Sequence, residues 1–177
     1  MQATGRAGGT ARQQRGRLAT GRPITGRLAT GRLAGLVRAA AAAGEWPGLV
    51  RYSEHDRWYH RLAQDDDHEV WLLTWLPGQR TGFHDHCGSA GAFTVAAGQL
   101  RERTVRLGSA AVPVGRDLAT GGVRAFGPRH VHEVVNASAA PAVSIHAYSP
   151  PLAGMRRYEL TAAGLWLAAA PTAGERW

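Results

Sequence analysis

Apolar positions beyond residue 60 come in short runs that are separated by clusters of Gly, Pro, Asn and Asp. These runs predict strands at 68–76, 92–97, 100–107, 123–126, 130–136 and 142–148. Short strands at close spacing are typical of an all-β sandwich or barrel. A closed barrel also removes exposed strand edges, which would otherwise template aggregation. The pattern therefore predicts an all-β fold.

The N-terminal part has a different pattern. Leu33, Leu36 and Val37, followed by an alanine run, predict a short helix that ends at Gly44. Before them, the triplet TGR recurs every five residues, at 20, 25 and 30, a period that fits neither a helix face nor a strand face. Residues 1–31 also lack aromatic side chains and cannot offset the entropy of ordering. We therefore expect a disordered Arg/Gly-rich tail over 1–31 and one folded domain over 32–177.

The charge is concentrated in that tail. Residues 1–38 contain eight arginines and no acidic residue, while the remaining arginines equal the Asp and Glu in number. A basic tail can bind polyanions, but the folded part offers no such argument, so nucleic acid is an unlikely partner. The single cysteine, Cys87, excludes an internal disulfide. With no apolar run of membrane-span length, we expect a cytoplasmic protein without a membrane partner.

Candidate metal ligands lie in the segment from Gly78 to His86. On a strand, His84 and His86 point to one face and Asp85 to the other. Neutral imidazoles that converge on one point typically bind Fe, Zn, Cu or Ni. Cys87 follows directly, but it shares the parity of Asp85, so we expect an ordinary thiol rather than a ligand.

A second histidine motif follows between Gly122 and Asn136. His130, His132 and Asn136 share one strand parity, so this strand can supply a third metal ligand. The parity alone allows either histidine to be that ligand.

The spacing of both motifs resembles a known family. G-x5-H-x-H followed by Gly98, and later G-x5-P with H-x3-N, is similar to the two motifs of the cupin superfamily. The glutamate ligand that is usual in the first motif would fall at Gly91, which cannot coordinate a metal. A cupin with three histidines and no glutamate resembles the thiol dioxygenases, and specifically type I cysteine dioxygenase.

Other segments extend this resemblance over roughly residues 45–155. They are the Ser-x-His-x-Tyr-Ser-Pro-Pro segment at 144–151, the Tyr-x-Arg segment at 59–61 and Trp75, nine residues before His84. The resemblance implies a cupin-type β-barrel, or jelly roll, after the short N-terminal helix. It also selects His132 over His130 as the third ligand of one Fe(II) ion, beside His84 and His86.

The resemblance further implies roles for polar residues near the metal. Arg61, with Tyr59 nearby, would hold the substrate carboxylate, although an ion pair with one of Asp65–Asp67 or Glu69 is the alternative. Strand alternation places Ser144, His146 and Tyr148 on one face, where they could form a hydrogen-bonded chain that fixes the catalytic phenol. Simple packing of His146 and Tyr148 is the alternative there.

The implied reaction converts L-cysteine and O2 to cysteine sulfinic acid. Cysteine would bind iron through its thiolate and amine, and Tyr148 would orient or protonate oxygen species. The alternatives are a dioxygenase of 3-mercaptopropionate or a natural-product thiol, a metal cupin with other chemistry such as an isomerase, and a non-catalytic metal cupin that acts as a sensor or interaction module. Mammalian relatives carry a cysteine at the position of Gly91 that crosslinks to the active-site tyrosine, so Tyr148 should be unmodified here.

Overall fold

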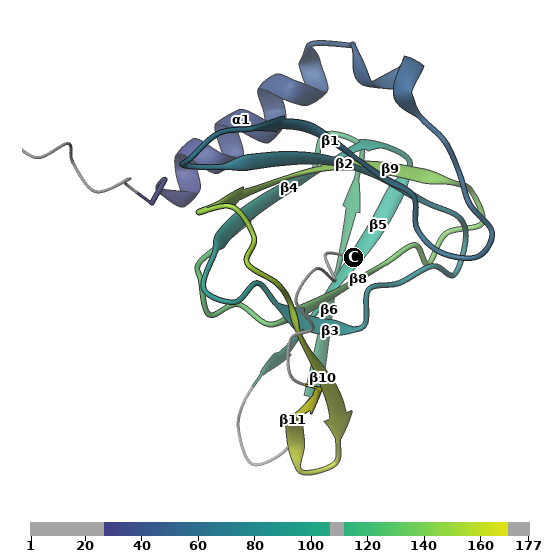
Figure 1. Ribbon diagram of the computed structural model, residues 1–177. Helices are drawn as coiled ribbons and strands as arrows, with labels where there is room; N and C mark the ends of the chain where they lie inside the picture. Colours follow the sequence, from purple (N-terminus) through teal and green to yellow (C-terminus); the bar gives the residue numbers. More distant parts are fainter. Residues whose placement is uncertain (1–26, 107–111, 170–177) are drawn as a thin grey trace, which may run out of the picture.

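The computed structural model describes residues 27–106 and 112–169, which form two curled antiparallel sheets that face each other (Figure 1). One sheet has the strand order β1-β2-β9-β4-β7 and the other β11-β10-β3-β8-β5-β6. The elements are α1 (Thr30–Ala42), the 3-10 helix η1 (Trp46–Leu49), β1 (Tyr59–Gln64), β2 (Glu69–Trp75), β3 (Phe83–Asp85), β4 (Ala90–Ala97), β5 (Gln99–Arg106), β6 (Val112–Ala119), β7 (Val123–Phe126), β8 (His132–Val135), β9 (Ala142–Ser149), β10 (Arg156–Thr161) and β11 (Gly164–Ala169). The expected all-β barrel is confirmed.

The six strands expected from apolar runs correspond to β2, β4, β5, β7, β8 and β9. The apolar pattern missed β1, β6, β10 and β11, and β3 was expected only from the spacing of His84 and His86. Most side chains of β6 are exposed, and this strand is held by its antiparallel pairing with β5. Strands β10 and β11 likewise form a hairpin at the edge of the same sheet. Because edge strands depend on backbone pairing more than on burial, they leave little apolar signal.

Strand β9 shows the expected alternation between two faces. Ala142 and Tyr148 belong to the cluster between the sheets, together with Trp75 and Phe93. Val143, Ile145 and Ala147 instead face the helix side. The inner face thus carries Ser144, His146 and Tyr148 into the space between the sheets, as the period of two requires.

Helix α1 covers the outer face of the first sheet (Figure 1). Leu33 and Val37 are fully buried there against Leu72 and Ile145. Burying each of these two helix side chains contributes about 1.5–3 kcal/mol. The helix begins at Thr30, and the backbone N–H of Leu28 donates to Ser149 Oγ at 2.9 Å. The first 26 positions of the expected tail lie outside the described residues.

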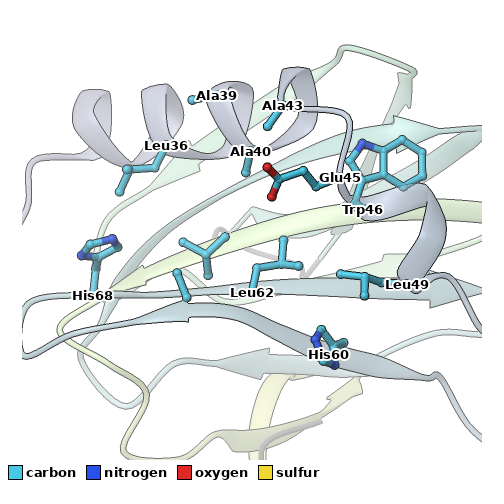
Figure 2. A pocket seen from close by; sticks show the side chains of 12 residues that line it. Leu36, Ala39, Ala40, Ala43, Glu45, Trp46, Leu49, His60, Leu62 and His68 are labelled. Carbon is cyan, nitrogen blue, oxygen red and sulfur yellow. The ribbon is translucent and has the colours of Figure 1, made fainter.

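A groove of about 400 Å³ lies on this outer side, between α1, η1 and the β1–β2 pair (Figure 2). Its lining is mainly apolar, with Leu36, Trp46 and Leu62, and it includes the polar His60 and His68. His60 faces this groove because its parity is opposite to that of Tyr59 and Arg61. The groove is therefore separated by a sheet from the side chains between the two sheets. Among the described residues, no helix is long and apolar enough to span a membrane.

Candidate metal centre

The two histidine motifs meet between the sheets. Strand β3 pairs with β8 so that His84 lies opposite His132, and His86 follows at the end of β3. The three rings lie 4.8–5.2 Å apart between centroids, and one nitrogen of each lies within 4.8 Å of the others. All three side chains are buried. The structure therefore brings together the three histidines that the sequence proposed as ligands.

The nitrogen atoms that face away from this cluster are fixed by acceptors. His84 Nδ1 donates to the carbonyl oxygen of Gly82 at 3.0 Å, and His132 Nδ1 donates to Glu102 Oε1 at 2.9 Å. Because a neutral imidazole has one N–H, both Nε2 atoms keep their lone pairs. Hydrogen bonding of the outer nitrogen is the usual way to orient a metal-ligating histidine.

His86 Nε2 is buried and has no hydrogen-bond partner in the described part of the chain. Leaving such a group unsatisfied costs about 1–3 kcal/mol. Burial lowers the pKa of His84, His86 and His132 below the ordinary value, so the imidazoles stay neutral. Three neutral nitrogen donors, one of which is this orphaned buried nitrogen, fit a divalent transition metal.

His130 lies beside this group but has another partner. Its side chain is 21% exposed, its ring stacks on Phe126, and Nε2 donates to Glu102 Oε1 at 3.0 Å. The group of histidines whose ring nitrogens converge on one point contains His84, His86 and His132, and His130 is not part of it. Of the two histidines, His132 is therefore the one whose ring nitrogen converges with those of His84 and His86, and it is the one that the family resemblance selected.

Glu102 of β5 was not anticipated from the sequence. Its carboxylate is 2% exposed, accepts from His130 and His132 through Oε1 and pairs with Arg124 through Oε2. Burial alone would raise the pKa of Glu102, but the hydrogen bonds from these three side chains outweigh it and lower the pKa. The carboxylate is therefore charged. The sequence signal that could have indicated its burial is the position of Glu102 two residues after Leu100. Both residues lie on the same face of β5, and Leu100 is also buried.

The opposite wall of the barrel carries a chain of polar side chains on β2 and β9. Trp75 Nε1 donates to Ser144 Oγ at 2.8 Å, Ser144 Oγ lies 2.8 Å from His146 Nε2, and His146 Nδ1 lies 3.2 Å from the hydroxyl of Tyr148. The expected Ser–His–Tyr chain is therefore present. Tyr148 ends this chain beside the three histidines, with its ring centroid 4.9 Å from that of His86.

The indole N–H gives this chain a direction. Trp75 can only donate, so Ser144 accepts from it and can use its own hydrogen on His146 Nε2. His146 Nδ1–H then donates to the Tyr148 oxygen, which turns the phenol hydrogen away from His146. Burial lowers the pKa of His146 to about 3, so its ring stays neutral, and burial also raises the pKa of Tyr148. Tyr148 therefore keeps its proton at neutral pH.

The proposed substrate-binding pair lies at the edge of the first sheet. Strand pairing sets Tyr59 opposite Leu73 and Arg61 opposite Trp71, so both share the inner face. Both side chains are nevertheless exposed, because β1 is an edge strand. Arg61 lies over the Trp71 ring at 5.3 Å, and Tyr59 packs edge-on against the same ring at 5.9 Å.

A different arginine is buried near the histidines. Arg57 precedes β1, is 7% exposed and lies 5.4 Å from the centre of the Trp75 ring. Among the described residues its Nε and Nη1 atoms have no hydrogen-bond partner, and the carboxylate of Asp56 is 3.8 Å from Nε. Burial lowers the pKa of Arg57, and its charge contributes to lowering the pKa of His84 and His146. A guanidinium remains charged at physiological pH, so this site favours an anion.

Comparison with known proteins identifies the family. The model of cysteine dioxygenase type I matches residues 33–161, well over half of the chain. The chain belongs to the cysteine dioxygenase type I family. This membership indicates a thiol dioxygenase at the family level, with a small thiol and O2 as substrates.

Solved structures support the fold of this dioxygenase family member. The protein TT1209 from Thermus thermophilus is 27% identical, with a TM-score of 0.50, and the match covers 60% of this chain and 95% of that one. An uncharacterized protein with a double-stranded β-helix domain from Klebsiella pneumoniae is 20% identical, with a TM-score of 0.52 and coverages of 70% and 94%. The expected cupin-type barrel is thereby confirmed. Curated proteins give no match.

Two further positions bear on whether a cysteine could crosslink to Tyr148. A Cβ at Gly91 would lie 2.5 Å from the Phe126 ring and 3.0 Å from that of Tyr148. Cys87 lies in the turn after His86 with a φ of +48°, so strand parity does not describe its direction. It is partly buried, which raises its pKa, and it is not in the group of converging histidines.

Proposed function

We propose that this protein is a mononuclear Fe(II) thiol dioxygenase that converts L-cysteine and O2 to cysteine sulfinic acid in the cytoplasm. The observation that carries the proposal is the buried cluster of three neutral histidines facing a protonated tyrosine and a buried arginine. His84, His86 and His132 would hold the metal through Nε2. Bound Fe(II) would supply the redox chemistry that joins both atoms of O2 to the substrate sulfur.

Arg57 would hold the carboxylate of cysteine. Its guanidinium can donate to a carboxylate, and the site leaves its Nε and Nη1 without hydrogen-bond partners in the described structure. Arg61 and Tyr59 stay a second candidate for this role because they share the inner face. Burial favours Arg57, since a charge pair that excludes water is worth more than an exposed one.

Tyr148 would donate a hydrogen bond to oxygen atoms of the bound reactants. Ser144 and His146 hold its phenol in one direction, anchored by the indole of Trp75. The raised pKa of Tyr148 keeps its hydroxyl protonated, so it can donate a hydrogen bond while it accepts one from His146. The buried setting also excludes water, which strengthens such polar interactions.

A carboxylate-binding arginine is compatible with a second substrate. 3-Mercaptopropionate carries the thiol and carboxylate of cysteine but lacks the amine, so Arg57 would recognise it equally. Cysteamine has the amine and lacks the carboxylate. The substrate class that fits the site is therefore a small carboxylate-bearing thiol, including natural-product thiols of that kind.

Oxygen consumption by the iron-loaded full chain tests this proposal. We expect the highest kcat/KM with L-cysteine, a lower value with 3-mercaptopropionate and the lowest with cysteamine. Sulfinic acid should form in step with oxygen uptake. Absence of uptake with every thiol would contradict a catalytic role, and preference for cysteamine would contradict the carboxylate site.

A further inference from the structure

The second histidine motif carries two histidines, His130 just before β8 and His132 at its first position, and one buried carboxylate touches both. Strand β5 pairs with β8 so that Glu102 lies opposite Val134 and Thr104 opposite His132. From there, Glu102 Oε1 accepts from His132 Nδ1 at 2.9 Å and from His130 Nε2 at 3.0 Å. A single oxygen atom thus contacts different nitrogens of two imidazoles.

We propose that Glu102 is a positioning residue of the metal centre that selects His132 rather than His130 as the third ligand. This inference rests on the metal centre of the proposed function and concerns how its ligand set is fixed.

The physical argument starts from the acceptor-only character of a carboxylate. His132 must carry its hydrogen on Nδ1 to bond Glu102, which leaves the Nε2 lone pair directed at His84 and His86. His130 must carry its hydrogen on Nε2 to bond the same oxygen. That nitrogen of His130 is therefore occupied by a hydrogen and cannot bind a metal.

Charge balance makes this arrangement stable in a buried place. Arg124 pairs with the other carboxylate oxygen of Glu102, so the group is not an isolated buried anion. The same arginine argues against a second metal bound by Glu102, His130 and His132, although these atoms also lie within 4.8 Å of one another. The guanidinium of Arg124 already pairs with Oε2 of Glu102, and both imidazoles already donate to Oε1. Glu102 thus acts through His132 rather than as a ligand.

The chain offers a matched control for testing this. Glu133 is adjacent to His132 in sequence, is 4% exposed and pairs with Arg103 Nη1 at 2.6 Å. It is thus another buried glutamate with an arginine partner, but it points away from the histidines because its parity is opposite to that of His132. Both Glu102→Gln and Glu133→Gln remove a buried charge from an arginine pair, and only the first alters a histidine contact.

The experiment measures Co(II) binding to the metal-free full chain. We expect Glu102→Gln to weaken the affinity about 10- to 100-fold and to change the visible Co(II) spectrum. Glu133→Gln should leave affinity and spectrum close to wild type, although both variants lower the melting temperature. Equal Co(II) affinities for Glu102→Gln and Glu133→Gln would overturn the proposed role of Glu102 and leave the metal centre standing. A wild-type chain that binds no Co(II) would overturn the metal centre as well.

A measurement on the wild-type chain decides the matter even if Glu102→Gln fails to fold. Nitrogen-15 NMR of the Zn(II)-loaded protein should show His132 protonated at Nδ1 and metal-bound at Nε2, with His130 protonated at Nε2. Metal bound to His130, or His132 bound through Nδ1, would overturn the proposal.

Discussion

The two inner walls of the barrel present opposite chemistry to the space between them. On the wall of β3, β8 and β5, acceptors hold the outer nitrogens of His84 and His132, so the inner atoms offer lone pairs. On the wall of β2 and β9, the hydrogen-bonded chain starts at a donor, the indole of Trp75, so its inner end offers a hydrogen from Tyr148. The lone pairs of the first wall favour a bound cation. The second wall, together with Arg57, offers hydrogen-bond donors that favour an anion or an oxygen atom.

This difference separates two kinds of defect. Changes in the histidine wall should remove the metal and with it all turnover. Changes in the opposite wall should leave the metal bound and alter only how substrate is held or protonated. Metal content and kinetics, measured on the same variants, therefore report on the two walls separately.

The largest effect is expected for the ligands themselves. Replacing His84, His86 or His132 with alanine should each reduce bound iron to background, because two imidazoles hold a divalent ion far more weakly than three. His130→Ala should retain iron, since its ring bonds to Glu102 instead. Elemental analysis of the purified variants measures this. Loss of iron in His130→Ala with retention in His132→Ala would reverse the ligand assignment.

The next effect concerns the two arginines near the substrate side. Arg57→Gln should weaken transition-state binding of L-cysteine by about 2–5 kcal/mol. This corresponds to a fall in kcat/KM of roughly 30-fold to several thousand-fold, with iron content unchanged. Arg61→Gln should change it only slightly, because its side chain is exposed over Trp71.

Cysteamine provides the internal control for the arginine pair. It has no carboxylate, so its turnover should be nearly the same in wild type and in Arg57→Gln. If Arg61→Gln gives the large loss and Arg57→Gln does not, the substrate carboxylate lies at the sheet edge. Equal losses for both thiols would assign a structural role to the affected arginine.

A smaller effect, on stability, is expected at Gly91 of β4, which lies opposite Phe126 of β7. Gly91→Cys should destabilise the fold by about 1–3 kcal/mol, because the new Cβ would lie 2.5 Å from the Phe126 ring. Thermal melting of this variant, with the double variant Gly91→Cys and Phe126→Leu as control, measures the clash. An unchanged melting temperature would show that the ring moves aside freely.

Wild-type Tyr148 should stay an unmodified phenol because glycine supplies no sulfur for a thioether. The intact mass should match the sequence before and after turnover with L-cysteine and O2. A loss of two hydrogens that maps to peptides with Cys87 and Tyr148 would contradict this and bring Cys87 into the site.

The smallest effect is expected for the N-terminal tail. Deleting residues 1–26 should change the free energy of unfolding by less than about 0.5 kcal/mol and leave turnover intact. Deleting residues 1–31 should cost more, because it removes the start of α1 and the Leu28 contact with Ser149. Urea unfolding of both truncations measures the difference. A large loss of stability or turnover on deleting 1–26 would show that the tail is not passive.

The sequence predicted that His84, His86 and His132 come together, because they lie in two motifs of fixed spacing, although parity alone left His130 as an alternative to His132. Strand parity was sufficient for Ser144, His146 and Tyr148, which all face inward on β9. Parity says nothing about Arg57, because this residue lies in the loop before β1. Its burial, at 7% exposure, is a tertiary property, and the sequence pointed only to Arg61.

Glu102 was missed for a related reason. Its strand, β5, has three charged residues in a row, Arg101, Glu102 and Arg103, so charges fall on both faces and the burial of one glutamate is not evident. Its burial depends on partners from two other strands, His132 of β8 and Arg124 of β7. Asn136 of the second motif has a structural role: its side-chain amide donates to the carbonyl oxygens of Trp75 and Ala140, which ties the end of β8 to β2.

The most direct test of the two-wall account is product analysis with isotopically labelled dioxygen. Iron-loaded full-length protein is incubated with L-cysteine under ¹⁸O2, and the product is analysed by mass spectrometry. The account predicts cysteine sulfinic acid in which both sulfinyl oxygens carry the label, formed by wild type and lost in His132→Ala. Formation of cystine without sulfinic acid, or a sulfinic acid whose oxygens come from water, would contradict it.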